Sequence, residues 1–399
     1  MIRVAAKASR AMKNGPGPSF PLLKPPLPPP PKAAAAPIVR HFSTNNSTFT
    51  ANPVAVEMIK GSHEAAIERL GKIQDLSLPS IALKVAASEA LVGIYLECYR
   101  EDAASVVADL ALQVLGAIRL EIRDGGGFEV LEARVKALKG LIELICGNLD
   151  SAQSLFEGVQ AERFFIGNAA LSYGEFLHGM RRFSTAKELY QKIIQETSEV
   201  KDFRDPNNLG ACNMIPEEVS VAAACALGQL EAHMGNFNDA EEVLTAALKK
   251  MEERFGPHHP KVGVILTCIA LMYRLKARME RSSSLLIEEG LFRRAIELLK
   301  APPLEADGAC ENFQRKDIIA LARVASFTYI YVLKLVNGCE GGYAETLCVQ
   351  QSRKAEGERL KQWAERGWGN HWMSLGEALE LSESSPRVPV IDTRICRAV

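Results

Sequence analysis

The amino-acid sequence predicts an all-α fold behind an irregular N-terminal segment. Helical periodicity of apolar residues runs from about residue 52 to 382, and only short stretches rich in Gly, Pro or Asn interrupt it. No run of alternating β-branched residues indicates a strand in this range. The 399-residue chain is 47% hydrophobic and 24% charged, a composition typical of a globular protein with a large core.

Charge is distributed unevenly along the chain. Residues 1–56 carry seven Lys or Arg and no Asp or Glu, which leaves 40 basic and 48 acidic residues in the rest, a net charge of −8. The composition excludes a collagen, a largely disordered chain and a disulfide-dense secreted scaffold. The longest apolar run, 318–336, contains Arg323 and Lys334, so it predicts a buried helix and not a membrane span.

Residues 1–50 are predicted to be a transit peptide followed by a disordered Pro/Ala-rich segment. The stretch from Met1 to Lys13 is predicted to be a basic amphipathic helix without acidic residues, which is typical of organelle targeting. Arg40, Phe42 and Ser43 resemble the plant mitochondrial presequence pattern, in which an arginine precedes cleavage between an aromatic and a small residue. We expect a mature start at or just after Ser43 and a location in the mitochondrial matrix. The chloroplast stroma is the alternative destination, and a disordered basic tether is the alternative role.

Three segments of the chain superpose on one another. Each has a glycine, then an alanine 12 positions later, then a bulky residue four positions after the alanine. These residues are Gly140, Ala152 and Phe156; Gly174, Ala186 and Tyr190; and Gly228, Ala240 and Leu244. The pattern resembles the 34-residue tetratricopeptide repeat, a pair of antiparallel helices. There the small residues let the two helices approach closely, and the bulky residue fills the space between neighbouring repeats. Asp150, Ser184 and Asn238 are predicted to cap the second helices.

A fourth copy is more specialised. Residues 256–262 contain a Gly-x-x-His-Pro turn and resemble the longer repeat of kinesin light chains. The second helix of this copy, with Gly290 and Ala295, arrives later in the sequence than the family pattern implies. Residues 277–289 are therefore either an insertion or an extension of the first helix.

The resemblance implies a right-handed superhelical solenoid of about six or seven tetratricopeptide helix-turn-helix pairs. We assign this repeat domain to residues 52–382, with the clearest repeats at 133–300. Closing helices are expected at 317–337, 343–366 and 371–380, and residues 383–399 are expected to be a disordered tail. Trp363, Trp368 and Trp372 either cover the end of the solenoid, which we favour, or anchor a partner.

No catalytic or metal-binding constellation is present in the sequence. It lacks a glycine-rich phosphate loop, a His-Glu-x-x-His pair and a Gly-x-Ser-x-Gly elbow. The Ser-x-x-Lys match at 184–187 is explained by a helix start. The nine cysteines form no Cys-x-x-Cys pair, and His258 and His259 belong to the Gly-x-x-His-Pro turn. We therefore expect no enzyme activity, no cofactor and no metal.

The concave face of a tetratricopeptide array is lined by fixed positions of each first helix. In this chain those positions give a set of candidate partner-binding residues: Arg134, Asn168, Glu175, His178, Gln229, His233 and Arg274. The Lys and Asn with which chaperone-binding members clamp a C-terminal carboxylate are absent, which argues against a chaperone-tail adaptor. A mixed apolar groove suits an apolar peptide or helix of a protein partner.

The resemblance implies a non-enzymatic scaffold or adaptor in an organelle, with assembly of a multisubunit complex as the expected process. The alternative is a helical-repeat RNA-binding protein that acts on organellar transcripts. Irregular repeat spacing and the net charge of −8 outside the N-terminal segment disfavour nucleic acid as the partner.

Overall fold

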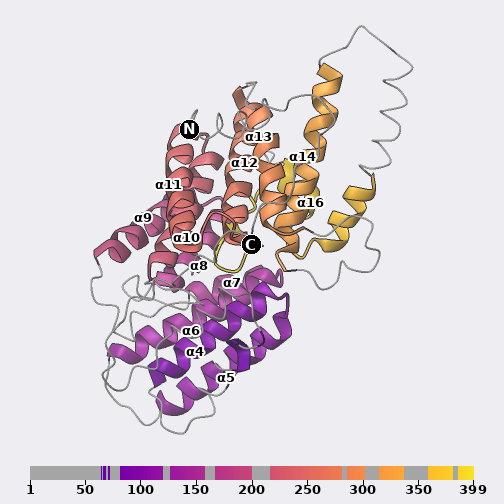
Figure 1. Cartoon of the computed structure of the whole chain (residues 1–399). Coiled ribbons are helices and arrows are strands. Elements are labelled where there is room, and N and C mark those ends of the chain that lie inside the picture. The colour runs from indigo at the N-terminus through magenta and orange to yellow at the C-terminus, as the bar shows by residue number, and fades with distance from the viewer. Residues whose placement is uncertain are drawn as a thin grey trace, which may run out of the picture. The chain divides into compact units, whose positions relative to one another are not determined.

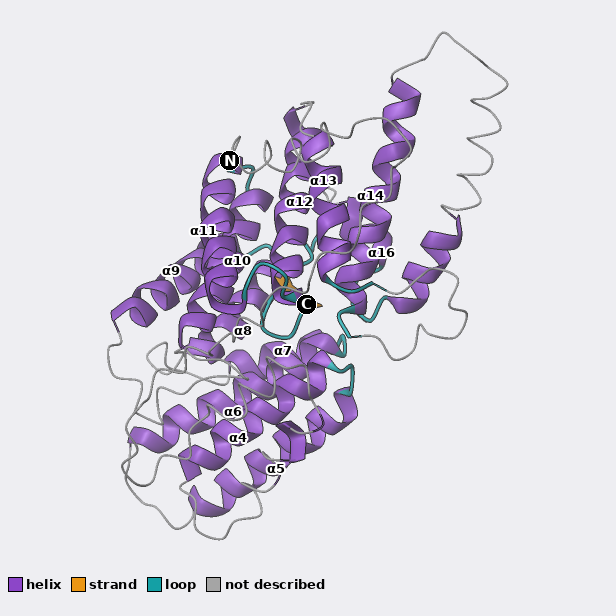
Figure 2. Ribbon diagram, in the orientation of Figure 1, coloured by secondary structure: helices purple, strands orange, loops and turns teal. Residues whose placement is uncertain are grey.

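The structure is a computed structural model. It describes residues 64, 66–68, 71, 81–119, 126–157, 167–199, 216–280, 285–301, 314–336, 358–380 and 385–399. Within these residues the fold is almost entirely helical, which confirms the all-α class (Figure 2). The predicted transit peptide and Pro/Ala-rich segment, 1–50, with Arg40, Phe42 and Ser43, lies outside the described residues.

Successive helices pack as neighbouring pairs (Figure 1). The pairs are α4 (Ile81–Glu97) with α5 (Glu101–Arg119), α6 (Gly126–Ile145) with α7 (Leu149–Glu157), α8 (Gly167–Gly179) with α9 (Phe183–Glu199), α10 (Pro216–His233) with α11 (Phe237–Phe255), and α12 (Pro260–Glu280) with α13 (Leu285–Leu298). The first helix of each pair also packs against the first helix of the next, and α12 packs against α14 (Lys316–Val336). These first helices therefore form one continuous layer.

The same backbone turn ends the first helix of four pairs. One residue in each turn adopts a left-handed conformation: Tyr99 (φ 57°), Gly147 (φ 83°), Arg181 (φ 60°) and Gly235 (φ 84°). In every case the next amide donates to the carbonyl five residues earlier, at 2.8 or 2.9 Å, which closes the helix end. An alanine with no exposed surface follows five residues after each left-handed residue: Ala104, Ala152, Ala186 and Ala240.

Glycine permits the close approach of the two helices within a pair. A Cβ atom added at Gly140 would lie 2.9 Å from the Phe156 ring. The corresponding distances are 2.7 Å from Gly174 to the Tyr190 ring and 2.5 Å from Gly228 to Leu244 Cγ. The predicted role of the glycines is confirmed in these three pairs. The bulky residues lie at the crossing within each pair. Phe156 also contacts the rings of Tyr173 and Phe176 in the next pair, as predicted.

The predicted helix caps are wrong. Helices α7, α9 and α11 begin one residue before Asp150, Ser184 and Asn238, so these three residues lie inside the first turn. The reason is that the left-handed turn is a single residue, which brings the chain into the second helix sooner.

The extra length in the fourth copy is in part an extension of the first helix, because α12 continues to Glu280.

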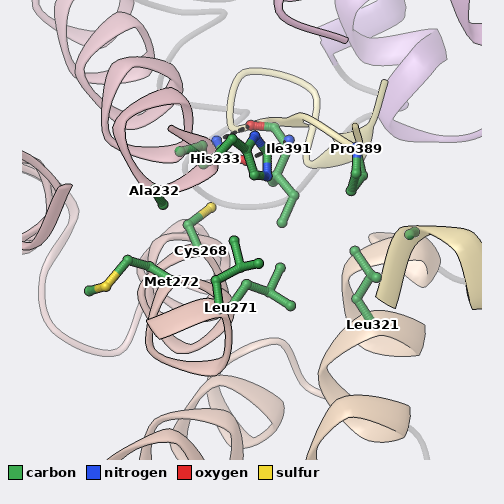
Figure 3. A pocket seen from close by; sticks show the side chains of 11 residues that line it. Ala232, His233, Cys268, Leu271, Met272, Leu321, Pro389 and Ile391 are labelled. Carbon is green, nitrogen blue, oxygen red and sulfur yellow. Dashed lines mark hydrogen bonds between the residues drawn. The ribbon is translucent and has the colours of Figure 1, made fainter. Parts of the chain in front are cut away.

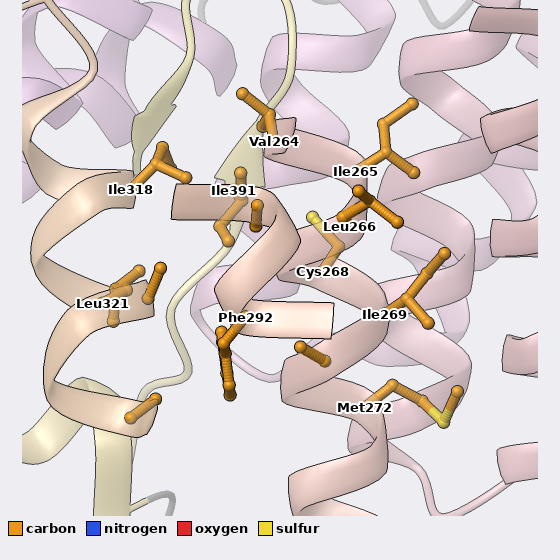
Figure 4. Packing of buried hydrophobic residues seen from close by; sticks show 14 of the residues in the cluster. Val264, Ile265, Leu266, Cys268, Ile269, Met272, Phe292, Ile318, Leu321 and Ile391 are labelled. Atoms are coloured by element: carbon orange, nitrogen blue, oxygen red, sulfur yellow. The ribbon is translucent and has the colours of Figure 1, made fainter. Parts of the chain in front are cut away.

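The expectation of a disordered tail over 383–399 is wrong for the residues that the structure describes. Residues 391–392 (β1, Ile391–Asp392) pair antiparallel with β2 (Arg397–Ala398), and every residue from 388 to 399 is buried. The physical reason is packing against two hydrophobic clusters. Ile391, for example, lies against α12 and α14 among Cys268, Ile318 and Leu321 (Figure 4).

The region before this tail consists of α14, a helical stretch at 358–367 and the short helix α16 (Leu375–Glu380). The predicted closing helix 317–337 corresponds to α14. None of the helices described here is both long enough and apolar enough to cross a membrane.

The glycines at the helix crossings give a test of this packing. We expect Gly174→Ala and Gly228→Ala each to lower the free energy of unfolding by about 1–3 kcal/mol, because the added methyl overpacks the crossing. Gly290→Ala is the matched control, since Gly290 is exposed in α13 and nothing lies within 4 Å of an added Cβ. The control should gain up to about 1 kcal/mol of helix propensity. Urea unfolding measures all three, and equal effects would contradict the close approach.

Candidate functional site: a groove filled by the C-terminal segment

Residues 385–399, here called the C-terminal segment, fill a groove along the layer of first helices. Side chains of α5, α8, α10 and α14, the Tyr99 ring, the Asn370 side chain and the backbone carbonyls of Leu96 and Gly369 contact this segment. Arg394 and Arg397 are among the largest side chains in the described residues that are completely buried. A buried guanidinium must be paired and hydrogen-bonded to be stable, so the partners of these two arginines define the groove.

The first arginine is held by one face of α8. Asn168, Ser172 and Glu175 are spaced four and three residues apart, which places their side chains on the same side of the helix. Arg394 Nη1 donates to Asn168 Oδ1 at 3.3 Å and to Ser172 Oγ at 3.2 Å. Arg394 Nη2 forms an ion pair with Glu175. Asp392, two residues earlier in the segment, accepts from Arg394 Nη2 at 2.8 Å.

Two carboxylates therefore share one guanidinium in this site. Burial raises the pKa of Glu175 well above its usual value, and the Asp392 carboxylate raises it further, while Arg394 opposes both effects. The Arg394 guanidinium favours the ionised form of Glu175 against the effect of burial. Loss of Arg394 would leave two buried carboxylates without a cation.

The second arginine lies in a pocket with one aromatic wall. The guanidinium carbon of Arg397 sits 4.0 Å from the centre of the Tyr99 ring, a cation–π contact. Arg397 Nη1 donates to Glu101 Oε1 at 2.5 Å and to the Leu96 carbonyl at 3.3 Å. Arg397 Nη2 donates to the carbonyl of Gly369 at 3.1 Å.

Asp317 closes this pocket from α14. Its Oδ2 atom lies 3.5 Å from Arg397 Nε, and its Oδ1 atom accepts from the Gly369 amide at 2.7 Å. Burial raises the pKa of Asp317, and the charge of Arg397 works against that shift. Gly369 has no room for a side chain, because an added Cβ would lie 2.9 Å from the Tyr99 ring and 3.2 Å from Arg397 Nη2.

Gln229 of α10 recognises the backbone of the segment. Its Oε1 atom accepts from the Ile391 amide at 2.8 Å, and its Nε2 atom donates to the Ile391 carbonyl at 3.0 Å. One amide side chain thus satisfies both backbone groups of one extended residue, as a neighbouring strand would. Asn370 Nδ2 donates to the Ala398 carbonyl at 3.3 Å, and the Val388 amide donates to the Gly179 carbonyl at 3.0 Å.

His178 and His233 form a buried pair at the ends of α8 and α10. His178 Nε2 and His233 Nδ1 are 2.8 Å apart, and the Tyr190 hydroxyl lies 3.4 Å from His178 Nδ1. Burial lowers the pKa of His178 well below its usual value and lowers that of His233 to about 4. Both imidazoles are therefore neutral at neutral pH, which fits a chain in which Tyr190 donates to His178 and His178 donates to His233.

The structure places the sequence-predicted groove residues in three settings. Asn168, Glu175 and Gln229 surround the C-terminal segment, and His178 and His233 contact each other. Two predicted groove residues instead join helices by ion pairs. Arg134 binds Glu89 of α4 with distances of 2.8 and 2.6 Å. Arg274 lies 3.4 Å from Glu288 of α13 and donates to the Ala325 carbonyl of α14 at 3.0 Å.

Sequence reasoning missed both arginines of the segment and several of their partners. The missed groove residues are Tyr99, Glu101, Ser172, Asp317 and Gly369. A signal was present in residues 388–399, which are mostly apolar and thus unlike a disordered tail. Tryptophans in the residues before the segment pack against the helices. The guanidinium of Arg323 in α14 lies over the Trp363 ring. The Trp372 ring lies so close to Gly179 of α8 that an added Cβ there would be 3.0 Å from it.

A small cavity remains between α10, α12, α14 and the segment (Figure 3). Gln229, His233, Cys268, Leu321 and Pro389 are among the residues that line it. Its volume of about 20 Å³ is enough for about one water molecule. Among the described residues there is no group of three His, Cys, Asp or Glu side chains that could hold a metal ion.

No protein-family model matches the chain, and no curated protein matches it in sequence. The resemblance to the tetratricopeptide repeat therefore rests on this chain's own residues.

Breaking the Arg394 site should destabilise the fold. We expect Arg394→Gln to lower the free energy of unfolding by about 3–5 kcal/mol, because it leaves the buried Glu175 and Asp392 without their cation. Arg293→Gln is the control, since its ion pair with Glu289 is on the surface and is worth about 0.5 kcal/mol or less. Chemical denaturation of both variants measures the difference, and similar midpoints would show that Arg394 is not required.

The histidine pair should make the fold sensitive to acid. Both imidazoles have a lower pKa in the folded protein than the usual 6.5, so the unfolded chain binds more protons as the pH falls. Their contribution is complete above about pH 6.5 and is lost toward pH 4. For His233 alone the loss between about pH 7 and pH 5 is on the order of 1–2 kcal/mol.

The measurement is urea unfolding of the wild-type chain and of His233→Asn at both pH values. The variant keeps an acceptor for His178 but removes one titrating group, so it should lose less stability in acid than the wild-type chain. An unchanged pH dependence in the variant would argue against a buried neutral His233.

Proposed function

We propose that the chain is a non-enzymatic protein-interaction scaffold or adaptor whose groove binds a segment of a partner protein. The single observation that carries this proposal is how the groove holds its own C-terminal segment. Gln229 binds backbone groups, and two sets of acidic, amide and aromatic side chains bind arginines. Such side chains recognise a peptide by its backbone and by a few anchors, which is a recurring mode of peptide binding.

The scaffold in this proposal is a right-handed superhelical solenoid of tetratricopeptide-like helix pairs. Three features support it: the turn that recurs between paired helices, the buried alanine five residues later, and the packing of each first helix on the next. Each pair in such an array contacts mainly its neighbours, so the layer of first helices offers a long binding surface.

A protein partner is favoured over RNA by the charge of the groove. Glu101, Glu175 and Asp317 all face the segment, and these carboxylates would repel phosphate groups. The process we propose is assembly of a multisubunit complex in the mitochondrial matrix, with the chloroplast stroma as the alternative location. This part of the proposal rests on the N-terminal segment and on the family resemblance.

The test is the native size of the protein in organelle extracts, with and without RNase, for the wild-type chain and two variants. We expect a large assembly that survives RNase and that Gln229→Leu disrupts, because the variant cannot bind a peptide backbone. Gln153→Leu is the control, since Gln153 donates to Glu157 on the surface of α7 and lies away from the groove residues described above. Circular dichroism must show that both variants remain folded.

Two outcomes would overturn the proposal. Collapse of the assembly with RNase would favour an RNA-binding protein. A folded Gln229→Leu variant that still enters the full-sized assembly would show that the partner does not use this groove.

A further inference from the structure

The C-terminal segment is bound in the groove as a peptide ligand would be. All residues from 388 to 399 are buried, and the contacts that hold them come from elements far away in the sequence. Arg394 is 219 residues from Glu175, and Arg397 is 301 residues from Leu96. The polar contacts run along the segment in a fixed order, with Gln229 at Ile391, then α8 at Arg394, then the Tyr99 pocket at Arg397.

We propose that this hairpin segment is a built-in occupant that competes with a segment of a partner protein able to form the same hairpin, and that the partner carries two arginines three residues apart. This inference rests on the proposed function and names the chemistry of the partner. An apolar residue precedes the Asp-x-Arg-x-x-Arg pattern of the segment, 392–397, and we expect the partner to share that pattern.

The charges of the groove carry the first step. Glu175 and Asp317 are nearly completely buried, at 2% and 0% exposure, and Glu101 lies beside Arg397. An occupant must therefore supply positive charge at two points that are three residues apart, one in the turn at 393–396 and one in the second strand of the β1–β2 hairpin. Asp392 leaves with the segment, so a partner with an acidic residue two positions before its first arginine restores all the contacts of Arg394.

The geometry of the donors selects arginine over lysine. Arg394 binds four side chains through its three nitrogens: Asn168, Ser172, Glu175 and Asp392. Arg397 stacks on a ring while donating to Glu101 and to two carbonyls. A lysine ammonium is a point charge with three donors. It cannot stack on an aromatic ring and form two divergent sets of hydrogen bonds at the same time, as a guanidinium does.

The exchange of one occupant for another conserves the contacts, so concentration decides it. A tethered segment has an effective local concentration on the order of millimolar. A partner segment at micromolar concentration therefore competes poorly until the internal segment is weakened. The groove is in this sense self-inhibited.

The experiment uses the full chain and a fluorescently labelled peptide with the sequence of residues 386–399. Binding is measured by fluorescence anisotropy to the wild-type chain, to Arg397→Lys and to Arg293→Lys as the control. Arg397→Lys keeps the charge of the internal segment but weakens its hold, so we expect it to bind the peptide at least about tenfold more tightly than the other two chains, a change of about 1.4 kcal/mol. A peptide with Lys in place of both arginines should bind at least about tenfold more weakly.

Hydrogen exchange of the wild-type chain provides a second measurement, independent of any variant. The chain is mixed with an excess of the same peptide labelled with heavy isotopes, so that mass spectrometry distinguishes the peptide from residues 388–399 of the chain. The added peptide should increase the hydrogen-exchange rate of the chain's own residues 388–399. Equal binding of the Arg and Lys peptides, or unchanged exchange at the highest peptide concentration, would overturn the inference. If the native assembly still depends on Gln229 in that case, the proposed function stands and only the competition is wrong.

Discussion

The pairing of buried arginines with buried carboxylates is the constraint on which the rest of this structure depends. Glu175 and Asp317 come from helices far apart in sequence, and burial raises the pKa of each. In the described groove, Arg394 and Arg397 meet these carboxylates from one short segment. An unpaired buried charge costs about 3–5 kcal/mol, so these pairs hold the segment against α8 and α14.

The same segment joins two hydrophobic clusters. Val390, Ile395 and Val399 belong to the cluster formed mainly by α4 to α10, while Ile391 and Cys396 belong to the cluster of α10 to α16. The groove is therefore also a seam in the core. A partner that replaced the segment would take over structural as well as recognition contacts, so binding and stability are coupled.

Much of the helix layer could be predicted from the sequence, because its signals are local. Gly174 and Tyr190 lie in successive helices, and the rule that joins them repeats in neighbouring pairs. The groove positions followed from the same rule, which is why Asn168, Glu175 and Gln229 were found. The C-terminal segment was missed, since its order comes from contacts between residues separated by most of the domain, and no periodicity encodes them. Asp317 and Gly369 were missed for the same reason.

The sequence separation within the Arg394 site has a consequence for folding. Glu175 pairs with a cation that lies 219 residues later in the sequence. Closing so long a loop costs conformational entropy before the contact is formed. The paired helices contain mostly local contacts and can form early, whereas the groove is completed by the most distant contacts. Docking of the segment should thus be among the last steps of folding, so the acidic groove is completed only when the end of the chain reaches it.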